Sequence, residues 1–323
     1  MVRITAIHRG DIVCDADYLQ CTDADAVWVH IANPNEEEVR HLREHFHLDV
    51  SQRFEGVRED DVYTYIPTRL ITLAEDDARP VLRTVVLALG ERVVATIDDH
   101  SGSPAFEKAR RRILRKPKLG ENPRTILRVV LQCLNEAGEQ LIDRIGDDLA
   151  VTGAEIIAIS GSLRFKGKDV GIIDLTALIS QLHIKEELIS QCLERQLFLA
   201  RAARRLDSEI DNLAEPELAI LLDELIADIN GVKEHASYEH EKVRYLQEAV
   251  NASLNIKQNQ IVKIFTIIAA VFMPPTLVAS VYGMNWAVMP ELAWTHGFFA
   301  SITVMTLSAL LPLVYIKRRR WLR

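Results

Sequence analysis

The side chains best suited to do chemistry lie between Glu248 and Glu291, a stretch without a single carboxylate. Amide, hydroxyl and apolar side chains recur there at roughly helical spacing. Mg²⁺ gives up its bound water reluctantly, so neutral groups that bind the water shell suit a hydrated cation, whereas a dehydrating cage would need acids. Small and hydroxyl residues are also typical of helix packing in lipid, so spacing alone leaves both interpretations open. The candidate pore-lining residues are Asn259, Val262, Phe265, Ala269, Met273, Thr276 and Ser280.

A second candidate for chemistry is the segment 41–45, His-Leu-Arg-Glu-His, which matches the inverted zinc-peptidase pattern. Two histidines four residues apart on a helix share a face and are able to bind Zn²⁺. No third ligand is evident, so incidental surface histidines are the favoured interpretation, and a peptidase active within residues 1–120 is the alternative. The sequence has no phosphate-binding loop and no dinucleotide motif, so ATP-driven pumping has no support, and we expect no enzyme activity.

Two apolar runs near the C-terminal end are each about as long as the twenty or so residues that cross a bilayer as a helix. They predict transmembrane helices at 261–282 and 297–316, joined by an external loop at 283–296. Lys257, Lys263 and a basic tail at 317–323 place both chain ends on the cytoplasmic side. The sequence therefore predicts a two-span protein of the plasma (inner) membrane, in contact with the lipid bilayer.

The elements upstream of these spans divide into a mixed region and a helical region. Residues 1–122 contain β-branched runs typical of strands, so we expect an α/β (α+β) cytoplasmic domain. One helix in it is predicted to begin with Asn33 as N-cap and Pro34 at the first helical position, followed by three glutamates. The β-branched runs are Ile4–His8, Val27–Ile31, Val62–Leu73, Val81–Leu89 and Val93–Ile97.

From Pro123 onward the periodicity is helical. A helical hairpin region is predicted at 123–215, interrupted near residues 160–168. Pro216 is suited to open the next helix, and no further proline occurs before Pro274. We therefore expect a stalk helix at 216–260 that continues into the first span, about 100 Å long at about 1.5 Å per residue.

Composition limits the classes of partner. The net charge of −8 argues against nucleic acid, because binding phosphates requires a contiguous basic face. A mean hydropathy of +0.03 is too polar for a protein with many membrane spans. The cysteines form no C-x-x-C pair and are interpreted as free thiols in a reducing compartment. They are Cys14, Cys21, Cys133 and Cys192.

The segment after the first predicted span reads Val-Tyr-Gly-Met-Asn at 281–285 and Met-Pro-Glu-Leu at 289–292. In this position, after a span and before a second span with a basic end, it resembles the signature loop of the CorA family of magnesium and cobalt transport proteins. The resemblance is specific over roughly residues 245–322 and extends upstream only in the order of elements. The related ZntB branch, which transports zinc, shares Gly-Met-Asn, but the intact Met-Pro-Glu-Leu loop favours the magnesium branch.

The resemblance implies a homopentameric funnel whose first spans line a central pore. Gly283, Met284 and Asn285 would form the selectivity filter, with the Asn285 amides binding hydrated cation and Gly283 permitting the turn. Glu291 would concentrate cations outside the mouth. Asn259 would form an inner polar ring, and Val262, Phe265 and Met273 would be hydrophobic constrictions. The implied cargo is Mg²⁺, with Co²⁺ or Ni²⁺ also possible, and no cofactor is expected.

The resemblance also implies regulation by Mg²⁺ bound between neighbouring cytoplasmic domains. The stalk side of such a site would comprise Asp223, Glu224 and Asp228. The helix that normally supplies the partner aspartate is shortened or absent here, and acids on a stalk are also typical of a solvated face. Candidate partners are Asp49, Glu59, Asp60 and Asp61. Within the same fold, two alternatives to a magnesium channel remain: a ZntB-type Zn²⁺ transporter and a membrane protein without selective transport.

Overall fold

The computed structural model of the chain divides into two compact units. The first unit comprises Met1–Ile157 and Ala177–Gln247, and the second unit comprises Ala158–Thr176 and Glu248–Arg323. The residues that the structure describes are 2–8, 11–16, 26–50, 56–73, 80–98, 103–162, 164–165, 168–169, 172–210, 214–284, 289 and 294–318.

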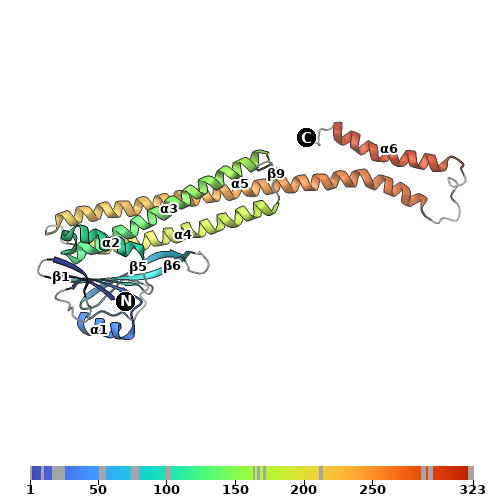
Figure 1. Cartoon of the computed structure of the whole chain (residues 1–323). Helices are drawn as coiled ribbons and strands as arrows, with labels where there is room; N and C mark the ends of the chain where they lie inside the picture. The colour runs from blue at the N-terminus through green and yellow to red at the C-terminus, as the bar shows by residue number, and fades with distance from the viewer. Residues whose placement is uncertain are drawn as a thin grey trace. The chain divides into compact units, whose positions relative to one another are not determined.

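The first unit contains a seven-stranded mixed sheet with the strand order β2-β1-β3-β7-β6-β5-β4. Figure 1 labels β1, β5 and β6 of this sheet. The pair β3·β7 is parallel, with Trp28 opposite Val94, and every other pair is antiparallel. The sheet confirms the predicted strands and adds β2 and β4. The strands are β1 Val2–His8, β2 Asp11–Ala16, β3 Ala26–Ala32, β4 Arg58–Glu59, β5 Tyr63–Leu73, β6 Pro80–Gly90 and β7 Val94–Asp98.

The sheet is covered on both faces, and the alternation of side chains along β6 shows how. Val85, Leu87 and Leu89 belong to one buried cluster, together with residues of the helices α2 (Pro104–Arg115), α3 (Pro123–Ser162), α4 (Ile172–Ser208) and α5 (Pro216–Tyr282). Val86 and Ala88 belong to a second cluster, together with residues of α1 (Glu36–Phe46). Because successive strand residues point to opposite faces, a run that is hydrophobic throughout is buried on both sides. Figure 1 accordingly shows α1 on one face of the sheet and the long helices on the other.

The helices begin and end close to the predicted points, with one addition. Pro123 opens α3 and Pro216 opens α5, as expected of proline in the first turn. The addition is α2, whose five cations in twelve residues mask the buried stripe formed by Ala105, Ala109 and Ile113. The bounds are α1 Glu36–Phe46, α2 Pro104–Arg115, the 3-10 helix η1 Pro117–Gly120, α3 Pro123–Ser162, α4 Ile172–Ser208, α5 Pro216–Tyr282 and α6 Gly297–Arg318.

The predicted N-cap of α1 is wrong by two residues. Asn35 caps the helix, since its side chain accepts a hydrogen bond from the backbone N–H of Glu38, and the Glu38 carboxylate accepts one from the N–H of Asn35, each at 2.8 Å. Asn33 instead lies in the left-handed region with φ 44°, and its N–H bonds to the Asp98 carbonyl at 2.9 Å. The reciprocal pair satisfies two donors of the first turn, which decides the start of the helix.

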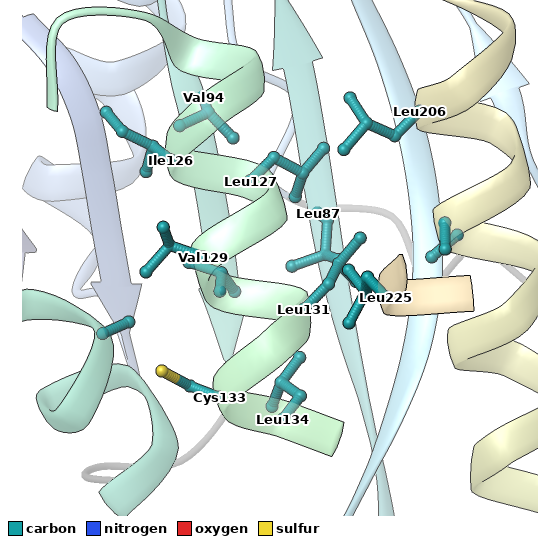
Figure 2. Packing of buried hydrophobic residues seen from close by; sticks show 14 of the residues in the cluster. Leu87, Val94, Ile126, Leu127, Val129, Leu131, Cys133, Leu134, Leu206 and Leu225 are labelled. Carbon is teal, nitrogen blue, oxygen red and sulfur yellow. The ribbon is translucent and has the colours of Figure 1, made fainter. Parts of the chain in front are cut away.

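The interior of the first unit is filled where α3 crosses the sheet. Figure 2 shows Leu127 and Leu131 of α3 beside Leu87 of β6, with Leu206 of α4 and Leu225 of α5 close to them. All five are at most 3% exposed. Each fully buried leucine contributes about 1.5–3 kcal/mol of transfer free energy, so this contact layer holds the helices on the sheet.

The second unit contains the end of α3, the short hairpin β8 Arg164–Phe165 and β9 Lys168–Asp169, the start of α4, the last part of α5, and α6. The hairpin lies in the interruption predicted near residues 160–168. Both α5 and α6 contain a window that is long and apolar enough to cross a membrane, with mean hydropathies of 2.1 and 1.9. These windows are 0% and 6% buried by the chain itself, so the spans are not the interior helices of a soluble core.

Candidate ion pathway

The seven candidate pore-lining residues lie on one face of α5. The helix is continuous from Pro216 to Tyr282. At about 100° per residue, the steps of three or four residues from Asn259 to Ser280 keep all seven side chains within an arc of about 120°. The prediction of a common face is therefore consistent with a helix that runs through the whole segment.

Within one chain this face is uncovered. Val262, Phe265 and Met273 are 62%, 67% and 68% exposed, and the other four candidates are exposed as well. A shallow groove of about 460 Å³ runs along the same face. Four candidates line the groove, and two residues that the sequence analysis did not name, Phe272 and Leu277, complete it. The lining residues are Ala269, Phe272, Met273, Thr276, Leu277 and Ser280.

The aliphatic hydroxyl groups of the span are concentrated on this face. Between residues 261 and 282 the only hydroxyls are those of Thr266, Thr276, Ser280 and the terminal Tyr282. The three aliphatic ones fall within the same arc of about 120°. Thr266 donates to the Val262 carbonyl at 2.8 Å and Thr276 to the Phe272 carbonyl at 2.7 Å. Each hydroxyl oxygen therefore keeps lone pairs for a donor outside the helix, such as a cation's water.

Two consecutive prolines, Pro274 and Pro275, lie inside the span. Proline lacks an N–H, so the carbonyls of Ala270 and Val271 lose their usual helical donor, and the helix bends at such a site. Figure 1 shows α5 curving over its last turns. Carbonyl oxygens without a helical donor are additional neutral acceptors within the span.

Helix α5 ends at Tyr282, directly before the Gly-Met-Asn motif, of which the structure describes Gly283 and Met284. The N–H of Gly283 bonds to the Ala279 carbonyl at 2.9 Å, and that of Met284 to the Val281 carbonyl at 3.3 Å. A Cβ at Gly283 would lie 3.2 Å from the Ala279 carbonyl oxygen, so close approach favours glycine here, and φ lies outside the left-handed region. Asn285 and Glu291 lie outside the described residues, and their predicted roles stay predictions.

The proposed regulatory acids Asp223, Glu224 and Asp228 are all exposed on α5. Glu224 and Asp228, four residues apart, share a face, whereas Asp223 is rotated by about 100° from Glu224. Glu224 also acts electrostatically on Arg128 of the same chain. Among the described residues, no three His, Cys, Asp or Glu side chains gather so as to hold a metal ion within one chain. A site completed by a second subunit stays a prediction.

The candidate partner acids mostly have other contacts. Asp60 accepts hydrogen bonds from the backbone N–H groups of Val62 and Tyr63 at 2.8 and 2.6 Å. Burial opposes the charge of Asp60, but these hydrogen bonds outweigh it and hold the pKa below its ordinary value. Glu59 pairs with Arg205, and Asp49 lies 3.9 Å from Arg43. Asp61 is exposed.

The histidine pair of the zinc-peptidase pattern adopts a different arrangement. The rings of His41 and His45 stack with centroids 4.2 Å apart, and Nδ1 of His45 lies 3.2 Å from the His41 carbonyl oxygen. No third ligating side chain joins them among the residues that the structure describes. The peptidase interpretation therefore gains no support from the geometry.

Known proteins resemble this chain over nearly its full length. The sequence model described as "CorA-like Mg2+ transporter protein" matches residues 23–318. The magnesium transport protein CorA of Sodalis glossinidius is 30% identical over 318 residues, covering 95% of each chain. The complete CorA magnesium transporter structure from Methanocaldococcus jannaschii has a TM-score of 0.74 at 16% identity, covering 98% of this chain and 96% of that one.

The ZntB cytoplasmic domain from Vibrio parahaemolyticus is also similar, with a TM-score of 0.51 at 14% identity, over 71% of this chain and 87% of that one. At such low identity, both structural matches show the fold alone. The match to the complete CorA structure agrees with a mixed sheet, long helices and two candidate membrane helices.

Proposed function

The chain belongs to the family of CorA-like Mg²⁺ transporter proteins, and on that premise we propose that it passes hydrated Mg²⁺ across a membrane down its electrochemical gradient. The observation that carries the proposal is the single face of α5 on which the amide, the aliphatic hydroxyls and the apolar candidates gather without a carboxylate. Neutral acceptors at hydrogen-bond range bind the waters of Mg²⁺ without replacing them, which avoids the cost of dehydrating the ion. Co²⁺ and Ni²⁺ are proposed as further cargo.

The pore requires more than one chain. A helix surface as exposed as that of Phe265 and Met273 must be covered by lipid or by other copies. We place the hydroxyl face of α5 toward a central axis in a homopentamer and α6 toward lipid. The basic residues Lys317 and Arg318 at the end of α6 support a plasma-membrane orientation with both chain ends in the cytoplasm.

Along this pathway the residues act in series. Asn285 binds hydrated cation at the outer mouth, where Glu291 raises the local cation concentration. Val262, Phe265 and Met273 form apolar constrictions that close by excluding water. Asn259 binds the hydrated ion on the inner side. Asp223, Glu224 and Asp228 are proposed to bind regulatory Mg²⁺ together with a neighbouring subunit.

The decisive experiment is ion flux into proteoliposomes that contain the purified full chain. Mg²⁺ and Zn²⁺ are compared, each with and without cobalt hexaammine, which has the size of hydrated magnesium and holds its ligands tightly. We expect Mg²⁺ flux that cobalt hexaammine blocks. Zn²⁺ flux without Mg²⁺ flux would assign the chain to the ZntB branch, and an intact oligomer without flux of either ion would refute selective transport.

Two substitutions test the pathway itself. Asn285→Ala is expected to abolish selective uptake and to leave assembly intact, as judged by size-exclusion chromatography. Asn259→Ala is expected to lower Mg²⁺ flux, whereas Gln260→Ala, a matched amide rotated by about 100° out of the arc, should not. Equal effects of the two inner substitutions would remove Asn259 from the pathway.

A further inference from the structure

An open pocket of about 880 Å³ in the first unit is lined by α2, η1, α3 and the beginning of α5. Its volume lies in the range of about 300–1,000 Å³ that is typical of small-molecule sites. Six of its lining residues are cationic and one, Glu107, is acidic. The cations are Lys108, Arg111, Arg112, Arg115, Lys116 and Arg128. Such an excess is unusual in a chain whose net charge is −8.

Carboxylates balance only part of this charge. Glu136 accepts hydrogen bonds from Arg112 at 3.0 and 3.1 Å and pairs with Lys108 at 2.7 Å. Glu107 accepts one from Arg111 at 3.3 Å, and it also pairs with Arg110. Within the described part of the chain, the remaining three pocket cations have no ion pair. These are Arg115, Lys116 and Arg128.

Arg128 is the most informative of the three because it is only 8% exposed. Its Nη1 reaches Gln132 Oε1 at 3.4 Å, and its buried Nε has no hydrogen-bond acceptor. Burial, followed by the charge of Arg112, lowers the pKa of Arg128, against smaller opposing influences of Cys133 and Glu224. Burying a guanidinium without a carboxylate is costly, and this cost is recovered when an anion enters the pocket.

We propose that this pocket binds a polyphosphate anion. Guanidinium groups bind phosphate oxygens with two parallel hydrogen bonds, and cations on α2, on α3 and at the junction of α2 with η1 match a ligand with several charged groups in a row. Arg115 and Lys116 lie where α2 meets η1, and Arg128 lies on α3. Leu119 and Leu221 supply an apolar wall for any uncharged part of the ligand. The proposal is independent of the transport pathway.

The test is equilibrium dialysis of the purified full chain in detergent against radiolabelled inorganic triphosphate and, separately, ATP, with EDTA present to remove divalent cations. Wild type is compared with Arg128→Gln and with the double substitution Arg115→Gln, Lys116→Gln, whose two sites are exposed and tolerate the change. Arg144→Gln is the matched control, because Arg144 is an exposed arginine of α3 outside the pocket.

We expect saturable binding to wild type that weakens with salt, since the attraction is partly between exposed charges. Arg128→Gln should raise the dissociation constant about tenfold or more, and the double substitution should raise it similarly. Arg128→Lys keeps the positive charge but replaces the planar guanidinium by an ammonium group, so it should bind more tightly than Arg128→Gln and more weakly than wild type. Tighter binding of ATP than of triphosphate identifies a nucleotide ligand, and equal binding identifies recognition of the phosphate chain alone.

Three results would overturn the proposal. The first is no saturable binding to the folded wild type, as expected if an acidic segment of a neighbouring subunit fills the pocket. The second is equal affinity of wild type and the double substitution. The third is an equal loss in Arg144→Gln, which would indicate unspecific attraction to basic residues. Far-ultraviolet circular dichroism confirms folding, and if Arg128→Gln fails to fold, the exposed double substitution decides.

Discussion

Leu127 and Leu131 in the first unit are fully buried by strands and helices of their own chain, whereas Phe265 and Met273 in the second unit are 67% and 68% exposed. Both regions are rich in large apolar residues. The first unit uses them to close an interior, and the second presents them on bare helices. One chain therefore completes the interior of the first unit, whereas the spans of the second unit stay uncovered within one chain.

The largest effect that this comparison predicts follows from removing a side chain from the closed interior. Leu127→Ala should lower the free energy of unfolding by about 2–5 kcal/mol, because the contact layer cannot collapse around the cavity. Hydrogen exchange of β6 and β7 in the full chain measures the loss. Phe265→Ala is the control and should leave exchange in these strands unchanged. A similar loss in both variants would contradict the idea that only the first unit is complete within one chain.

A second prediction sharpens the comparison within the second unit. Thr276→Val keeps the shape of the side chain and removes the hydroxyl from the groove, so Mg²⁺ flux should fall about three- to tenfold, equivalent to roughly 1 kcal/mol. Thr303→Val on α6 removes a hydroxyl that likewise bonds to its own backbone, at 2.7 Å to the Phe299 carbonyl. It should leave flux unchanged. Equal losses would mean that the two spans do not differ in their access to the ion.

A third prediction concerns the local structure of the first unit. Asn35→Ala removes one half of the capping box and should cost about 1 kcal/mol of stability, measured by thermal unfolding. Asn33→Gly should cost little, because glycine readily adopts the left-handed backbone found there. A larger loss of stability in Asn33→Gly than in Asn35→Ala would instead indicate that Asn33 is the N-cap, as the sequence predicted.

The smallest effect is expected at Asp60, whose pKa lies below its ordinary value of 3.8 because backbone hydrogen bonds outweigh burial. The lowered pKa stabilises the fold above the unfolded-state value, and this contribution is lost as the pH falls through the folded-state value. Unfolding measured from about pH 5 downward should show a weaker loss of stability with acid in Asp60→Asn than in wild type. The same dependence of stability on pH in both proteins would show that the Asp60 carboxylate does not contribute to the loss of stability in acid.

The sequence predicted the elements whose signals are local. Proline in the first turn gave the starts of α3 and α5, β-branched runs gave the main strands, and two long apolar runs gave the candidate spans. Free thiols at Cys133 and Cys192 are also confirmed. The missed α2 has a narrow buried stripe among many cations, and the misplaced cap of α1 arose because Asn33 and Asn35 are both suitable caps by type.

For the candidate pathway, the sequence by itself determined which residue types occur and, through a continuous helical period, that they share a face. This holds because the position of a side chain around a single helix depends only on its number along the chain. The roles of Asn285 and Glu291 rest on the resemblance to the family.

Only the tertiary structure decided what brings separate elements together. Asn35 rather than Asn33 caps α1 because the chain at Asn33 turns to bond with Asp98 of β7. The cationic pocket exists because α2 and η1 pack beside α3 and α5, so that Arg115 and Arg128 line one space. No spacing along the sequence encodes that meeting, since it follows from how buried faces of different helices pack on one sheet.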